Sequence, residues 1–223
     1  MEKRGQVTVF IILGIIILLF VVAFISLKSF MATQQAKVEE EKAQQAALAG
    51  ESIKAYVESC IVRTTRDAIL ENSFSGGYFI LPEKSTTDLF DNVPYYFQDE
   101  QDLSPPDEKI AIEIARYVDE MLDFCLDDFK TFQELGYEIT TEKPKSEATL
   151  SPQKITVRTN LPITITIGEI TKQISNFMVS VSTTEFYKNI LTAREIIKNQ
   201  EKEEVCITCF SNLALENELL INI

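Results

Sequence analysis

The stretch from Val7 to Leu27, VTVFIILGIIILLFVVAFISL, dominates the sequence because it contains no charged residue. A helix of about 20 apolar residues spans the hydrocarbon core of a bilayer. Core helices of soluble domains seldom run this long without a polar face. We therefore predict a transmembrane helix within residues 1–28. Lys3 and Arg4 precede it, which favours a cytoplasmic N-terminus and an extracellular remainder.

The residues at the start of this stretch carry a more specific signal. Lys3-Arg4-Gly5-Gln6, followed by Val7, Thr8 and an apolar helix, resembles the class III, prepilin-type signal of archaeal type IV pilins. The resemblance implies cleavage between Gly5 and Gln6 by a prepilin peptidase, with the helix kept as an anchor or as a filament core. A plain single-pass anchor with basic flanks is the alternative. A looser resemblance, to uncharacterised surface proteins of small-genome archaea, adds no activity.

The chain after the apolar stretch predicts a stalk and then a folded domain. Residues 29–50 are rich in strong helix formers and poor in large apolar side chains, which predicts a helical stalk. From residue 51 onward Ile53, Val57, Cys60 and Ile61 recur at helical spacing, which predicts a core-facing helix. Residues 51–223 are therefore expected to form an extracellular domain.

Two more helices and a sheet are predicted within this domain. Ser104 and the following prolines predict a helix start, and Gly136 predicts its end. Residues between 154 and 182 alternate with a period of two, which predicts antiparallel strands with a turn at Gly168 and an edge or bulge at Pro162. Residues 185–200 predict an amphipathic helix. The expected fold is α+β: a long N-terminal transmembrane and stalk helix, followed by a small antiparallel sheet packed with two or three helices.

Four cysteines are the main candidates for covalent chemistry. Cys60 and Cys125 lie on apolar faces of two predicted helices, and Cys206 and Cys209 form a Cys-x-x-Cys pair. Outside the cell, disulfides are the default, and we favour the pairs Cys60–Cys125 and Cys206–Cys209. A thiolate metal site and a redox pair are the alternatives.

The densest aromatic cluster lies in residues 74–97. It consists of Tyr78, Phe79, Tyr95, Tyr96 and Phe97, and residues 78–81 and 93–97 predict the two short strands of a hairpin. Exposed aromatic side chains are typical of contact and carbohydrate surfaces, so this loop is a possible binding surface. The alternative, which we favour, is that these rings cap the domain core.

The amino-acid composition argues against two classes of function, nucleic-acid binding and catalysis. Lys and Arg total 21, Asp and Glu total 34, and the net charge of -13 argues against a nucleic-acid partner. The absence of His and of any catalytic or nucleotide-binding motif argues against an enzyme, and nothing implies a cofactor or metal ion. The resemblance favours a pilin-like structural protein of the cell surface whose partners are the lipid bilayer, copies of itself and a prepilin peptidase. It would reside in the membrane as a single-pass protein or in an extracellular filament. The alternative is a membrane-anchored extracellular binding module that uses loop 74–97.

Overall fold

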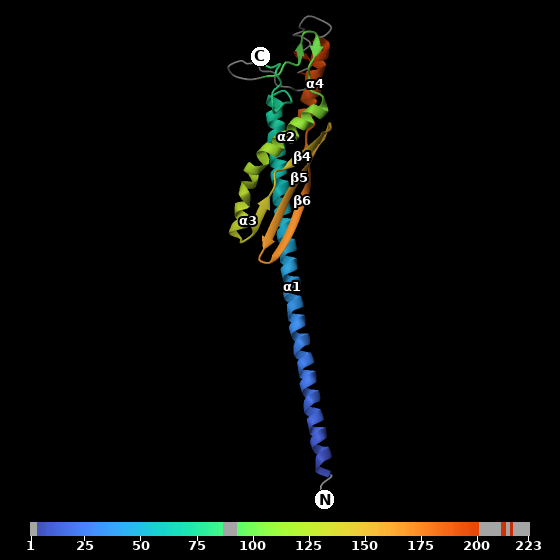
Figure 1. The fold of residues 1–223 in the computed structure, drawn as a ribbon. Helices are drawn as coiled ribbons and strands as arrows, with labels where there is room; N and C mark the ends of the chain where they lie inside the picture. The colour runs from blue at the N-terminus through green and yellow to red at the C-terminus, as the bar shows by residue number, and fades with distance from the viewer. Residues whose placement is uncertain (1–3, 87–92, 201–210, 213–214, 216–223) are drawn as a thin grey trace. The chain divides into compact units, whose positions relative to one another are not determined.

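The computed structural model describes residues 4–86, 93–200, 211, 212 and 215, and Figure 1 shows its ribbon. Side chains before residue 46 are described at some positions only. The chain divides into two compact units, Met1–Ala49 and Gly50–Ile223, and each is described by itself.

The first long element is a helix, α1, which runs from Arg4 to Phe74. Within the described residues, no helix is long and apolar enough to cross a membrane. The predicted fold class is therefore wrong in its transmembrane helix, although an α+β architecture with antiparallel sheets is present. Residues 7–27 belong to α1, which continues without interruption into the polar residues 29–50.

The part of α1 that belongs to the second unit is the central helix of the core. Ile53, Val57, Ile61 and Ala68 are completely buried, as their helical spacing predicts. They join buried residues of α2 (Asp107–Leu126), of the sheet and of α4 (Thr184–Gln200) in one hydrophobic cluster. The core-facing helix predicted from residue 51 onward and the helix predicted over 185–200 are confirmed.

The helix α2 is shorter than predicted at both ends. It begins at Asp107 because Ser104 does not cap it: the Ser104 hydroxyl and N–H both donate to the carboxylate of Asp102. It ends at Leu126 because the next three residues adopt left-handed backbone angles, with φ of 43°, 51° and 57°. These residues form the 3-10 turn η1 (Asp127–Phe129), which leads into the short helix α3 (Lys130–Glu134).

The four-stranded sheet is antiparallel throughout and is organised around one long strand. Its strands are β3 (Glu138–Thr141), β4 (Lys145–Leu150), β5 (Lys154–Ile167) and β6 (Ile170–Ser182). Figure 1 shows β4, β5 and β6 side by side. The hairpin of β5 and β6 turns at Gly168, as predicted, and β6 pairs with β5 along nearly its whole length. The other edge of β5 is shared by β3 and β4, which pair with its two halves.

Pro162 lies in the middle of β5 and marks a bulge, as predicted. The register between β5 and β6 shifts between Asn160 and Ile163. On the opposite edge, β4 pairs as far as Asn160 and β3 pairs from Ile163 onward. The missing N–H of Pro162 therefore falls in the gap between two short strands, where no ladder hydrogen bond is lost.

The predicted hairpin in the aromatic loop is wrong. Residues 78–81 form no strand; instead β1 (Phe97–Gln98) pairs with β2 (Gln101–Asp102). Residue 94 contributes only an isolated bridge to Ser85. The side chains around 78–81 pack onto α2, and this tertiary packing overrides their preference for strand.

Candidate functional site

The predicted processing residues lie at the edge of what the structure describes. Lys3 lies outside the described residues, and Arg4, Gly5 and Gln6 are the first residues of α1, without described side chains. Cleavage between Gly5 and Gln6 stays a prediction.

The predicted disulfide between Cys60 and Cys125 is present. It joins α1 to α2 across a Cα–Cα distance of 5.6 Å and closes a loop with a sequence separation of 65. Tyr56, one turn before Cys60, donates its hydroxyl to the backbone carbonyls of Cys125 and Leu126. The disulfide and these bonds fix the C-terminal end of α2 on α1. Cys206 and Cys209 lie outside the described residues.

The five aromatic residues of loop 74–97 do not share one open surface. Tyr78 is buried, and the ring of Phe79 meets that of Tyr117 on α2 edge-on, with centroids 5.0 Å apart. The Tyr96 hydroxyl donates to the carbonyl of Gly76 at 2.7 Å, and burial raises the pKa of Tyr96 to about 12. These contacts are those of rings that cap a core.

Two aromatic residues of this loop remain partly accessible. Tyr95 is 42% exposed, and Phe97 lies half-buried in β1. The other three rings of the loop pack against the domain, so Tyr95 and Phe97 offer little continuous apolar area. Ligand binding by loop 74–97 stays a prediction.

A buried carboxylate, which the sequence analysis did not select, holds this loop in place. Glu113 on α2 is fully buried and accepts the backbone N–H groups of Phe79 and Ile80 at 3.2 and 3.0 Å. Lys109 and Arg116 contact the same carboxylate at 2.7 and 3.1 Å. Burial acts to raise the pKa of Glu113, but the N–H of Ile80 and the two cations outweigh it, so this pKa lies below its usual value.

A second polar cluster joins α4 to the start of α2. Arg194 donates to the carboxylate of Asp107 at 2.6 Å and also to the carbonyl of Pro105. The Tyr187 hydroxyl donates to the other oxygen of Asp107 at 2.9 Å. Both clusters therefore use acids in the N-terminal half of α2, Asp107 and Glu113, to hold distant segments of the chain on this helix.

The outer face of the sheet carries a shallow hollow of about 410 Å³, the outer hollow. It opens over neighbouring residues of β4, β5 and β6, whose side chains alternate between the core and the surface. The strand register aligns its exposed lining in two cross-strand rows, Glu147–Arg158–Met178 and Lys145–Asn160–Asn176.

Part of this arrangement has a signal in the sequence. Glu113 stands among Ile110, Ile114 and Tyr117 on the apolar stripe of α2, and a charged residue on such a stripe indicates a buried anchor. The outer hollow has no comparable signal, because its rows depend on the register of three strands. That register is set by the bulge at Pro162 and by the break between β3 and β4.

The side chains described above include structural anchors and the outer hollow. No protein-family model, no curated protein and no solved structure matches this chain significantly. The function is accordingly inferred from its residues and their geometry.

Proposed function

We propose that this chain is a structural, type IV pilin-like subunit that assembles with copies of itself through the N-terminal segment of α1 and is displayed at the cell surface. The proposal joins the prepilin-like residues Lys3 to Gln6 to the surface chemistry of the helix that follows them. A prepilin peptidase that cuts after Gly5 is the expected processing partner.

The observation that carries the proposal is the exposure of large apolar side chains in this segment. Among the described side chains of this segment, eight are between 44% and 74% exposed. At 100° per residue they cover about two thirds of the directions around the helix axis. They are Leu13, Ile16, Leu18, Phe20, Val21, Val22, Phe24 and Ile25.

A helix that is apolar on all sides needs a cover. Burying one Val, Leu, Ile or Phe side chain is worth about 1.5–3 kcal/mol, so covering this segment is strongly favourable. Copies of the same segment, bundled together, provide a cover of matching chemistry and length. Lys28, whose ammonium lies 5.2 Å from the ring of Phe24, stands at the end of this surface.

The direct test is electron microscopy of cells that express the intact chain. Filaments are expected, and Ile16→Asp should abolish them because it places a charge inside the bundle. The matched control is Ile16→Leu, which keeps the apolar surface and should keep the filaments. Filaments that survive Ile16→Asp unchanged would overturn assembly through this segment.

A lipid bilayer is the competing cover, and Ile16→Asp also weakens partition into lipid. The N-terminal sequence of protein recovered from the cell surface separates the two. A mature chain that starts at Gln6, together with loss of processing in Gly5→Leu, supports the pilin-like subunit. A chain that keeps residues 1–5 and remains in vesicles without forming filaments contradicts it.

A further inference from the structure

The outer hollow is unusual for this chain because of its charge. The protein carries a net charge of -13, so copies of it repel one another unless positive groups meet negative ones. The two rows that line the hollow contain the cations Lys145 and Arg158 and one acid, Glu147. Within the described residues, neither cation takes part in an ion pair. The hollow is therefore a locally cationic surface on an acidic molecule.

The hollow also has an exposed apolar side chain on β6. Met178 lies across the strands from Arg158 and is 62% exposed. Its thioether is a favourable partner for an aromatic ring, and an arginine beside it can stack on the same ring. The volume of about 410 Å³ falls in the range of about 300–1,000 Å³ that accommodates ligand groups. This chemistry fits an aromatic side chain flanked by acids.

The same domain presents such a group at the end of α2. Phe124 is 78% exposed. Asp123 lies beside it in the helix, and Asp128 follows within the left-handed turn η1. Both acids are exposed, and within the described chain neither carboxylate forms an ion pair. Phe129, which is buried, anchors the turn that carries Asp128. We call Asp123, Phe124 and Asp128 the acidic knob.

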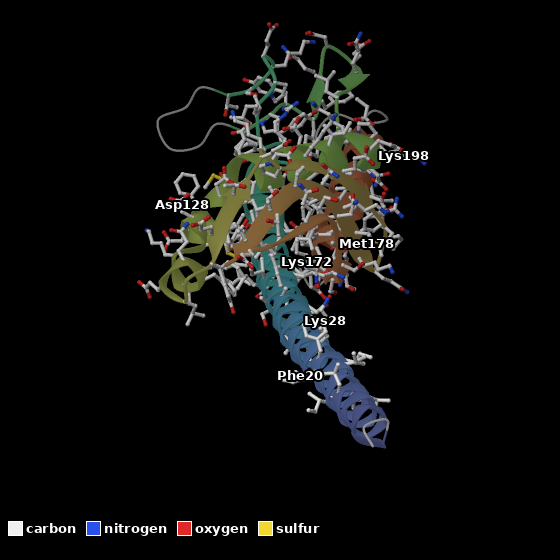
Figure 2. All side chains as sticks on the ribbon, turned by 60° about the horizontal axis from the view of Figure 1, so that its bottom comes forward. Phe20, Lys28, Asp128, Lys172, Met178 and Lys198 are labelled. Carbon is white, nitrogen blue, oxygen red and sulfur yellow. A yellow bond between two sulfur atoms is a disulfide. The ribbon has the colours of Figure 1, made fainter. Side chains whose placement is uncertain are left out.

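The knob and the hollow are two different surfaces of the domain. Figure 2 shows Asp128 and Met178 apart from each other, and none of the three knob residues lines the hollow of its own domain. A second copy is therefore needed to bring a knob into the hollow. Two complementary but different patches produce a head-to-tail contact, which repeats from copy to copy.

We propose that the outer hollow of one copy receives the acidic knob of the next, with Phe124 against Met178, Asp123 facing Arg158 and Asp128 facing Lys145. A buried Phe contributes about 150–250 Å², well below the roughly 800 Å² per partner of a standard interface. The contact is therefore a lateral one within a larger assembly, and in this respect it rests on the proposed pilin-like function.

The test is a charge reversal in the intact chain. Arg158→Glu alone and Asp123→Arg alone should each lower the fraction of protein that sediments as assemblies about tenfold, because like charges then face each other. The double variant restores the opposite charges and should restore assembly. Lys198→Glu on α4 is the matched control, since it makes the same charge change on an exposed residue outside the hollow and should have no effect.

Zero-length coupling of amines to carboxylates locates the contact directly. A mixture of ¹⁴N- and ¹⁵N-labelled wild-type chains should yield mixed-isotope peptides that join Lys145 to Asp123 or Asp128. Filaments without these links, or filaments insensitive to Arg158→Glu, overturn this contact and leave the proposed function standing. The links without filaments support the contact and contradict the proposed function. If the wild type instead binds an acidic polysaccharide at the hollow and no links form, the contact is overturned.

Discussion

The two ends of α1 carry similar apolar residues in opposite environments. Around Phe20 these side chains are exposed, whereas Ile53, Val57 and Ile61 are completely buried. Both ends form regular helix. What differs is the neighbour, because α2 and the sheet cover the second end within the same unit. Apolar composition therefore predicts that a surface needs a cover, but it does not identify what supplies that cover.

The largest expected effect is the loss of stability when one buried side chain of α1 is truncated, compared with the same change at an exposed one. Ile61→Ala should lower the free energy of unfolding of the domain by about 2–5 kcal/mol, since it leaves a cavity in the core. Leu18→Ala should change it by about 0.5 kcal/mol or less, because Leu18 is 62% exposed. Urea denaturation of the intact chain, followed by circular dichroism, measures both. Equal losses would show that Leu18 is as well covered as Ile61 and would contradict this difference between the two parts of α1.

The next largest loss of stability is expected when the disulfide between Cys60 and Cys125 is removed. Replacing Cys60 and Cys125 with alanine should cost about 2–4 kcal/mol, because the bridge closes a long loop in the unfolded chain. The same urea experiment measures the loss, and reduction of the wild type should reproduce most of it. If the double variant is as stable as the wild type, packing rather than the bridge holds α2 on α1.

Much of the domain could be predicted from the sequence. The stripe at Ile53, Val57 and Ile61 identified the central helix, and the pairing of Cys60 with Cys125 followed from two apolar helix faces. The bulge at Pro162 followed from a residue that cannot donate a hydrogen bond. In each case a local rule and the tertiary structure agree.

The remaining features depend on contacts between distant segments. The end of α2 at Leu126 depends on three left-handed residues, and propensity alone does not predict φ of 57° for Phe129. The strand expected at 78–81 is lost to packing on Tyr117 and to the carboxylate of Glu113. The outer hollow depends on strand register. The transmembrane prediction is wrong because, within the described residues, no helix is long and apolar enough to cross a membrane.

A smaller effect concerns the buried carboxylate that ties loop 74–97 to α2. Glu113→Gln should lower stability at pH 7 by about 1–3 kcal/mol, because a charged acceptor of two N–H bonds is lost. Since the pKa of Glu113 is lowered in the folded state, its contribution is complete above the usual glutamate pKa of about 4.3. The contribution disappears as the pH falls through the lower folded-state value. Wild type and variant should therefore converge in acid, and a gap that persists at low pH would contradict this.

The smallest effect has the opposite sign and comes from the same helix. Burial raises the pKa of Asp119, and hydrogen bonds from Ser146 together with the charge of Lys145 oppose the shift without cancelling it. Within the described residues, its Oδ1 has no hydrogen-bond partner. A group whose pKa is raised by folding holds its proton more tightly in the folded state, so its contribution favours folding below the usual aspartate pKa of about 3.9 and is lost as the pH rises through the folded value.

Asp119→Asn removes this charge and should leave stability at pH 7 unchanged or raise it by about 0.5 kcal/mol. Relative to the wild type, the variant should gain as the pH rises from 3 to 7, whereas Glu113→Gln should lose over the same range. Urea midpoints measured at several pH values give both slopes. If Asp119→Asn instead loses stability as the pH rises, the charged form of Asp119 is the one that the fold stabilises, and its bonds to Ser146 outweigh its burial.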